Sequence, residues 1–181
     1  MPSPRARSYR LFFALWPSAE LRDTLAAWSR QHAPHRARPV RPDNLHLTLA
    51  FLGSLPEERL DAVHAAGAAL RAAPVRLELA RVEHWPRPRL LCAVPAPGPD
   101  PLAGLATALR EQLTAHRLPV ETRPFRSHVT LVRKVSGTWS GAAFGPPLTW
   151  VGARFALVVS ESTREGVRYR ELAGWPLCEA G

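Results

Sequence analysis

Two histidine–threonine pairs recur in this chain of 181 residues. His46 and Thr48 lie in the segment NLHLTLAF, and His128 and Thr130 lie in SHVTLVRK. Residues two apart on a β-strand share one face, and both pairs are flanked by apolar residues. Each segment should therefore bury its apolar side chains and leave an imidazole and a hydroxyl together on the other face. None of the other five histidines is followed by Thr at the second position.

Two imidazoles and two hydroxyls around one groove would suit phosphoryl chemistry without a metal. A neutral imidazole can take a proton from the attacking water while a protonated one gives a proton to the leaving oxygen. The ordinary pKa of histidine lets both forms coexist near neutrality. The hydroxyls of Thr48 and Thr130 would donate hydrogen bonds to the phosphate oxygens. The pattern is symmetric, so it does not decide which histidine is the acid.

A zinc site is the alternative for the two histidines. It would need a third ligand from Cys, His, Asp or Glu near the pair, and the motifs carry Thr there instead. We therefore expect no metal and no cofactor.

Strict alternation along the two motif strands assigns the remaining side chains. It turns one set toward the core: Leu45, Leu47, Leu49, Phe51, Val129 and Leu131. It also places Lys134, rather than Arg133, on the face of His128. A role for Arg133 therefore needs a bulge or an early end of the strand.

The periodicity of apolar residues and the positions of Pro and Gly predict an α+β chain. Strands are expected over residues 8–15, 45–52, 75–84, 89–94, 127–135, 153–162 and 166–173, the last two as a hairpin. Helices are expected from Pro17 to His32, from a Ser54/Glu57 capping box to Ala73, and from Asp100 along a stripe of leucines (102, 105, 109 and 113). Residues 136–147 are expected to form a loop.

Each motif strand follows a helix at a comparable place in its half of the chain. This pattern suggests an internal duplication with a pseudo-twofold axis. The length fits a single domain spanning residues 1–181.

The charge is strongly positive, with a formal net value of +9, and Lys134 is the only lysine. Arginine binds phosphate in a bidentate manner, so nucleic acid or another polyphosphate is a natural partner, although biased composition alone would also give scattered arginines. The segments RPVR (38–41) and RPFR (123–126) lie just upstream of the two motifs. Arg41 and Arg126 are therefore substrate-binding candidates, together with Arg133 and Lys134.

Several classes of protein are disfavoured. No run of about 18 apolar residues could span a bilayer, and the start lacks a secretory pattern, so we expect a cytoplasmic protein that does not bind membranes. Cys92 and Cys178 form no C-x-x-C pair and are expected to be core thiols. There is no Gly-rich phosphate loop, which argues against ATP-dependent ligation.

Other side chains have a structural explanation beside a functional one. His64 and His116 are expected on helix surfaces. Trp85 and Trp139 could stack on an RNA base, but packing is the more common role of such residues.

The sequence resembles the 2H phosphoesterase superfamily, which has two H-x-T-x motifs on strands of a bilobal fold. Within it, the chain is similar to the LigT-type RNA 2′,3′-cyclic phosphodiesterases, formerly called 2′-5′ RNA ligases. The likeness rests on RLFFAL, PDNLHLTLAFLG, HVTLVR and YRELAGWPL. It departs from the usual pattern at Pro39, where many relatives have an aromatic residue, and at Ser127, where Pro is common.

The resemblance implies two pseudo-twofold-related lobes of antiparallel sheet with outer helices and a central groove. It implies an enzyme that opens an RNA-terminal 2′,3′-cyclic phosphate to a 2′-phosphate, with His46 as proton donor to the 3′ oxygen and His128 as proton acceptor from water. It also implies a phosphate or nucleotide contact for Arg133. The expected partner is an RNA end, with tRNA fragments as one candidate, and the expected state is a monomer.

Three alternatives remain at this point. The chain could act on another cyclic phosphate, such as an ADP-ribose cyclic phosphate or a small cyclic nucleotide. It could join RNA ends through a 2′-5′ bond. It could also be a basic RNA-binding module without catalysis, which would bind RNA in a salt-sensitive way.

Overall fold

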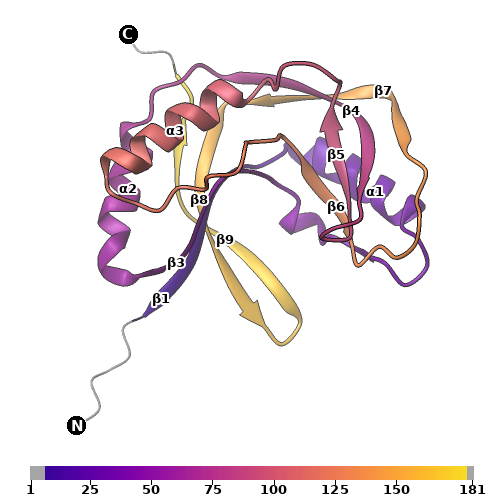
Figure 1. Ribbon diagram of the computed structural model, residues 1–181, viewed down its shortest axis with the longest axis horizontal. Coiled ribbons are helices and arrows are strands. Elements are labelled where there is room, and N and C mark those ends of the chain that lie inside the picture. The colour runs from indigo at the N-terminus through magenta and orange to yellow at the C-terminus, as the bar shows by residue number, and fades with distance from the viewer. Residues whose placement is uncertain (1–6, 179–181) are drawn as a thin grey trace.

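The computed structural model describes residues 7–178 and contains an antiparallel sheet flanked by helices (Figure 1). The strands are β1 Ser8–Leu15, β2 Arg38–Pro39, β3 Leu47–Pro56, β4 Val75–Trp85, β5 Leu90–Pro95, β6 Val129–Arg133, β7 Ala142–Gly152, β8 Arg154–Thr163 and β9 Gly166–Pro176. The α-helices are α1 Ala19–His32, α2 Leu60–Ala69 and α3 Ala103–Ala115, with short 3₁₀ turns η1 Pro42–Asn44 and η2 Glu57–Arg59.

The sheet consists of two halves of four strands each. The strand order is β7-β4-β5-β6-β3-β1-β8-β9. The short strand β2 lies outside this order and pairs with β6. The halves join between the two motif strands, where Leu47 pairs with Val129. Each of these residues stands between the His and the Thr of its motif, so equivalent positions of the two motifs pair with each other. An antiparallel pair of counterparts has a local twofold axis, and this confirms the expected bilobal α+β fold.

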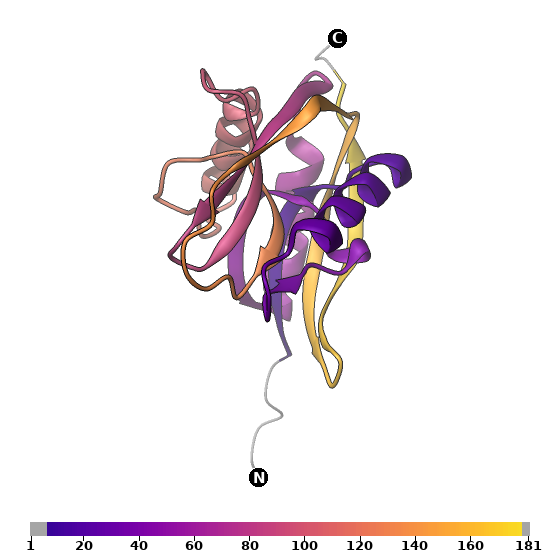
Figure 2. The same cartoon turned by 90° about the vertical axis from the view of Figure 1, so that its right-hand side faces the viewer.

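The helices follow the same symmetry. Helix α1 connects β1 to β3 yet contacts β6, whereas α3 connects β5 to β6 yet contacts β3. Helix α2 packs beside α3 and against β9, so α1 and the α2–α3 pair lie on different parts of the molecule (Figures 1 and 2). Each connecting helix therefore contacts the motif strand of the other half, so the helices link the two halves.

The first and third helices begin within three residues of their predicted starts at Pro17 and Asp100. Ser18 caps α1, since its hydroxyl accepts a hydrogen bond of 3.2 Å from the Leu21 amide. The predicted leucine stripe of α3 is buried, with exposed fractions of 5% or less at Leu102, Leu105, Leu109 and Leu113. The third helix thus buries the face that the pattern predicts.

The predicted capping box at Ser54 and Glu57 is wrong. Strand β3 continues through Gly53 to Pro56, because β1 begins at Ser8 and pairs with residues 53–56. The helix starts only at Leu60, and no side chain caps it. The hydrogen bonds to a strand that is distant in the sequence outweigh the local capping signal here.

The predicted loop over residues 136–147 is partly wrong, since β7 begins at Ala142 and pairs with β4. Pro146 and Pro147 lie inside this strand. β7 is at the edge of the sheet, where a proline removes no ladder bond from a second neighbour. The predicted hairpin near the end of the chain is confirmed as β8 and β9, and its tip extends beyond the rest of the sheet (Figures 1 and 2).

Two further expectations concern cysteines and membranes. Cys92 is fully buried, as predicted, whereas Cys178 is exposed and so is not a core thiol. Across residues 7–178, no helix combines the length and apolar character needed to cross a membrane.

Candidate active site

The first motif begins immediately after the turn η1 instead of inside a strand. Asn44, the last residue of this turn, connects it to β9 through its side chain. The side-chain amide of Asn44 donates to the Val167 carbonyl at 2.7 Å, and its side-chain oxygen accepts from the backbone amide of Tyr169 at 3.2 Å. Its backbone carbonyl accepts a hydrogen bond from Nδ1 of His46 at 2.7 Å. The hairpin therefore helps to hold the first motif in place, a contact that no local pattern indicates.

The environment of His46 favours a neutral imidazole. The Asn44 carbonyl can only accept, so Nδ1 carries a proton and Nε2 faces the Thr48 hydroxyl at 3.0 Å. The half-buried ring lies 5.0 Å from the rings of Phe12 and Tyr169, measured between centroids. Burial lowers the pKa of His46 to about 4, against the opposing effect of the Asn44 hydrogen bond and with further lowering by the charges of Arg133 and His128.

The second motif repeats this arrangement. Nδ1 of His128 donates to the carbonyl of Arg126 at 2.8 Å, again two residues upstream. Trp85 packs beside the ring, with 4.7 Å between centroids. Burial lowers the pKa of His128; the Arg126 carbonyl opposes this shift, the charges of Arg126 and Arg133 add to it, and Asp100 opposes it. Both imidazoles are therefore fixed by their own chain and present Nε2 as the reactive atom.

Asp100 holds the residue before the second histidine. Its carboxylate accepts hydrogen bonds of 2.6 Å from both the amide and the hydroxyl of Ser127, and one of 2.9 Å from the Leu102 amide. Ser127 is buried, so these bonds satisfy polar groups that water does not reach. The carboxylate thus fixes the entry to β6 from the start of α3. A proline at position 127, as in many relatives of the resembled family, would lack the amide donor.

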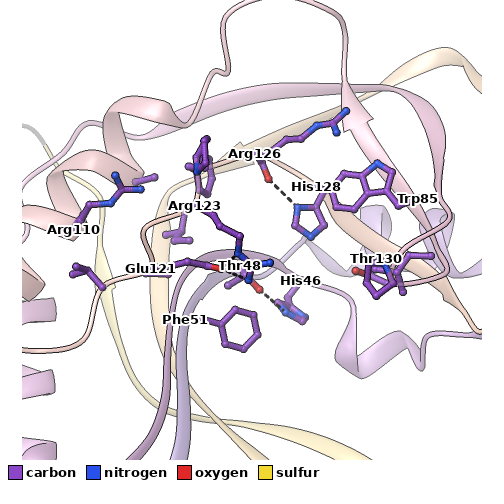
Figure 3. Close-up of a pocket in the computed structure, with 18 of the residues that line it drawn as sticks. His46, Thr48, Phe51, Trp85, Arg110, Glu121, Arg123, Arg126, His128 and Thr130 are labelled. Atoms are coloured by element: carbon purple, nitrogen blue, oxygen red, sulfur yellow. Dashed lines mark hydrogen bonds and ion pairs between the residues drawn. The ribbon is translucent and has the colours of Figure 1, made fainter.

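The two motifs meet at one pocket of about 460 Å³, lined by His46, Thr48, His128 and Thr130 (Figure 3). The pairing of Leu47 with Val129 explains the convergence. In an antiparallel ladder the neighbours of a pair face each other, so each motif histidine lies next to the threonine of the other motif. The sequence predicts this meeting point, and the structure brings all four side chains to it.

A bulge in β6 decides which basic residue faces the pocket. Cys92 of β5 pairs with Thr130, but Leu91 pairs with Val132, so Leu131 is an extra residue in the ladder. Leu131 and Val132 are both buried, and Arg133 returns to the face of Thr130 and lines the pocket.

Alternation places Lys134 there, and this placement is wrong. Lys134 lies beyond β6 with a left-handed φ of 59° and does not line the pocket. The strand ends before Lys134 can join the face of His128.

A second bulge does the same to Phe51 in β3. Phe13 pairs with Ala50 and Ala14 pairs with Thr48, so Leu49 is the extra residue. The prediction that Phe51 joins the core is therefore wrong. Phe51 is 40% exposed, lines the pocket and lies 5.5 Å from Phe12, measured between ring centroids. No pattern in a single strand signals such a bulge, since it depends on the partner strand.

Of the other two predicted substrate-binding residues, Arg126 lies at the pocket and Arg41 does not. Arg126 lines the pocket, and its guanidinium lies 4.9 Å from the centroid of the Trp85 ring. Arg41 does not line the pocket and lies 3.8 Å from a carboxylate oxygen of Glu165 in the hairpin turn. Trp85 thus belongs to the pocket wall, a place that the sequence alone does not assign to it.

Glu83 organises this wall. It accepts hydrogen bonds from Nε1 of Trp85 at 3.0 Å and from Arg81 at 2.6 Å, and it pairs with Arg126. Burial acts to raise the pKa of Glu83, but its hydrogen bonds and the nearby arginine charges hold it below the usual value. The carboxylate therefore stays ionised and fixes two side chains that flank His128.

The remaining candidates lie away from the pocket. His64 packs against Trp175, with 6.0 Å between ring centroids, and His116 bonds the Gln112 carbonyl at 2.8 Å. Trp139 packs against Trp28 at 6.2 Å between centroids. In the part of the chain that the structure describes, no group of three or more His, Cys, Asp or Glu side chains is arranged to hold a metal.

Known proteins are similar to this chain in both sequence and fold. Residues 15–92 match the family described as LigT like Phosphoesterase. The RNA 2′,3′-cyclic phosphodiesterase of Escherichia coli K12 is 34% identical over 171 residues, which covers 94% of this chain and 97% of that protein. The chain belongs to the LigT-like phosphoesterase family. A protein of the same name from Thermus thermophilus is 37% identical over an alignment that covers 93% of this chain and 90% of that protein.

Solved structures place the LigT-like fold over nearly the whole chain. The crystal structure of Escherichia coli LigT complexed with ATP superimposes with a TM-score of 0.84 at 33% identity, covering 96% of this chain and 100% of that one. A crystal structure described as a phosphoesterase gives a TM-score of 0.86 at 34% identity, covering 96% and 100%. The chain is thus a LigT-like enzyme of the 2H superfamily, and the alternative of a non-catalytic module is wrong.

Proposed function

We propose that this chain hydrolyses the 2′,3′-cyclic phosphate at an RNA end and leaves a 2′-phosphate. The observation that carries the proposal is the pair of imidazoles in one pocket. Each has Nδ1 fixed by the carbonyl two residues upstream and Nε2 available for chemistry, on strands related by a local twofold axis. The relatives named RNA 2′,3′-cyclic phosphodiesterase support the same substrate.

The reaction needs one acid and one base. The oxygen of a water attacks phosphorus, the bond from phosphorus to the 3′ oxygen breaks, and the charge developing on the phosphate oxygens must be stabilised. His128 takes the proton of the water, and His46 gives a proton to the departing 3′ oxygen. The hydroxyls of Thr48 and Thr130 donate to the non-bridging oxygens. The same set of residues balances every proton without a metal.

The acid and base roles follow the resemblance to the 2H family, and the surroundings of His128 fit its role as base. Nε2 of His128 has no hydrogen bond to any residue in the range 7–178, so it is open to a water. Nε2 of His46 instead contacts the Thr48 hydroxyl. Since burial lowers the pKa of His46 to about 4, its role as donor requires a bound phosphate anion, whose negative charge raises the pKa of a neighbouring imidazole.

Arg133 completes the proposed anion site, and Arg126 lies in the wall beside it. Both line the pocket, and Arg133 is close enough to lower the pKa of both histidines by its charge. A guanidinium matches the geometry of phosphate oxygens and stays charged at every working pH. We assign phosphate binding to Arg133 and support of the pocket wall near His128 to Arg126.

The test uses an oligoribonucleotide that ends in a 2′,3′-cyclic phosphate, incubated with the protein and EDTA. The expected product is the 2′-phosphate, identified against standards of both isomers. His46→Ala and His128→Ala should each lose at least about 100-fold in kcat, since each removes an acid or base worth roughly 10²–10⁴. His35→Ala is the matched control, because this exposed histidine lies outside the pocket.

Three results would contradict the proposal. Full activity in both pocket variants would remove the acid–base pair. A requirement for an added divalent ion would replace it with metal chemistry. Formation of the 3′-phosphate would show that the other ring bond of the cyclic phosphate is cleaved.

A further inference from the structure

Asn44 bonds His46 and strand β9 at the same time. Its backbone carbonyl accepts from Nδ1 of His46 at 2.7 Å, while its side chain bonds the backbone of Val167 and of Tyr169. Asn44 ends the turn η1, which is only three residues long and is closed by backbone hydrogen bonds among residues 41–45. So short a turn is weakly held by its own bonds. The position of the carbonyl that holds the imidazole therefore depends on the bonds of the Asn44 side chain to the hairpin.

The side-chain amide of Asn44 takes the place of a neighbouring strand on β9. This strand ends the strand order, so its outer edge has no partner strand among the described residues. Asn44 donates to the carbonyl of Val167 and accepts from the amide of Tyr169, two residues further along that edge. A carboxamide carries a donor and an acceptor on one group, as a peptide does. An Asp side chain, which has the same size, only accepts when it is ionised.

Tyr169 connects this anchor to the imidazole ring itself. Its ring lies 5.0 Å from that of His46 and 5.0 Å from that of Phe12, measured between centroids. Its backbone amide is the group that the side-chain oxygen of Asn44 holds. One side chain thus fixes both the acceptor of Nδ1 and an aromatic ring that packs against the imidazole.

The second motif is anchored differently. The carbonyl of Arg126 bonds Nδ1 of His128, as the Asn44 carbonyl bonds His46, but the backbone next to it is held by the bonds of Ser127 to Asp100. The local twofold axis therefore relates the two carbonyls and not the side chains that fix them. A change at Asn44 should act on one histidine and leave the other as it is.

We propose that Asn44 is a positioning residue for the reaction: its side chain, bound to β9, keeps His46 in the Nδ1–H tautomer and so directs Nε2 to the substrate. Which ring nitrogen of a histidine carries the proton is set by the hydrogen bond that the other nitrogen makes or lacks. This inference rests on the proposed function, in which Nε2 of His46 serves the departing oxygen. It adds a residue outside the two His-x-Thr pairs that this step needs.

The first experiment observes the tautomer of His46 directly. Long-range proton–nitrogen NMR correlations of the imidazole distinguish a protonated Nδ1 from a protonated Nε2, and the spectra of His46→Ala and His128→Ala assign the signals. Burial lowers the pKa of both imidazoles, so the neutral forms dominate near neutral pH. There, both wild-type histidines should show the Nδ1–H form. In Asn44→Ala, His46 should become a mixture of tautomers, whereas His128 should stay unchanged and so report a folded pocket.

Asn44→Asp is the second variant, because it changes less of the structure. It keeps the size of the side chain and the acceptor for the Tyr169 amide, but it loses the donor to the Val167 carbonyl. We expect it to shift the tautomer of His46 in the same direction as Asn44→Ala and to leave His128 unchanged.

The matched control is Glu165→Gln. It removes the ion pair between the hairpin turn and Arg41, the residue before η1, and leaves both bonds of the Asn44 side chain in place. It therefore disturbs the same two parts of the chain by another contact. His46 should keep the wild-type tautomer in this variant.

Kinetics on an oligoribonucleotide with a 2′,3′-cyclic phosphate end connect the tautomer to the reaction. Asn44→Ala and Asn44→Asp should each lower kcat by about 10- to 100-fold, part of the roughly 10²–10⁴ that a general acid supplies. KM should stay within about threefold of the wild type, since Asn44 does not line the pocket. Glu165→Gln should match the wild type in both parameters.

The outcomes are distinct. If His46 keeps the Nδ1–H tautomer in both Asn44 variants, or if both variants retain the wild-type kcat, Asn44 is not a positioning residue. A tautomer change in Glu165→Gln as large as that in Asn44→Ala would also overturn its specific role. If the wild type turns over no cyclic phosphate, the proposed function fails, and the NMR spectra still decide whether Asn44 fixes the tautomer of His46.

Discussion

Phe51 and Arg133 occupy equivalent positions on the two motif strands. Each stands three residues after its motif threonine, and each is turned to the pocket by a one-residue bulge, at Leu49 in one strand and Leu131 in the other. The local twofold axis at the junction of the halves relates the two bulges. The duplicated frame thus presents an aromatic ring on one side of the pocket and a guanidinium on the other.

Arg133 should be needed for activity and Lys134 should not. We expect Arg133→Ala to lower kcat/KM by about 100-fold, the cost of losing one positioned donor to a phosphate transition state. Lys134→Asn removes the adjacent charge with a residue that tolerates its left-handed backbone, and should stay within about twofold of the wild type. Steady-state kinetics on one RNA substrate compares them. The reverse order of effects would mean that alternation, and not the bulge, describes β6.

The pH optimum of kcat/KM should lie below about pH 6.5, the ordinary histidine pKa. This parameter reports the free enzyme, in which burial lowers the pKa of both histidines, that of His46 to about 4. The form with one proton shared by the pair is therefore most populated on the acid side of that value. The optimum of kcat should lie at higher pH, because bound phosphate raises both pKa values. A kcat/KM optimum on the alkaline side of neutrality would contradict these shifts.

The contact between Asp100 and Ser127 should contribute to stability and to the alignment of His128. We expect Ser127→Ala to lower the free energy of unfolding by about 1 kcal/mol through loss of one buried hydrogen bond. Ser127→Pro removes the amide donor as well and should cost about 1–3 kcal/mol, since it leaves a carboxylate oxygen unpaired. Urea unfolding measures both. Ser127→Pro with wild-type stability would show that the carboxylate finds another partner.

Two serines at apparent helix starts should differ. Ser18→Ala should lower the free energy of unfolding by about 1 kcal/mol, because its hydroxyl caps α1. Ser54→Ala should change it by less than about 0.5 kcal/mol, since this serine is an exposed strand residue that caps nothing. Denaturation of the two variants under the same conditions measures both free energies of unfolding. Equal losses would mean that Ser54 has a role that its surroundings do not show.

Local patterns predicted much of the fold. The apolar stripe of α3, the helix predicted from Pro17 to His32 and the β8–β9 hairpin depend on residues a few positions apart, so the sequence pattern alone predicts them. The two His-x-Thr pairs also predict a shared site, because their side chains must leave the core on one face. These features need no knowledge of which strands become neighbours.

Features that depend on a partner strand were not predictable in this way. The extra residues Leu49 and Leu131 exist only relative to β1 and β5, and they reversed the predicted positions of Phe51 and of the basic pair after the second motif. Pairing with β1 likewise extended β3 through the apparent helix start at Ser54. The types and the spacing of the reactive side chains are part of the covalent structure, so the amino-acid sequence alone determines them. The side chains that accompany them depend on strand register, which hydrogen bonds set between segments far apart in the chain.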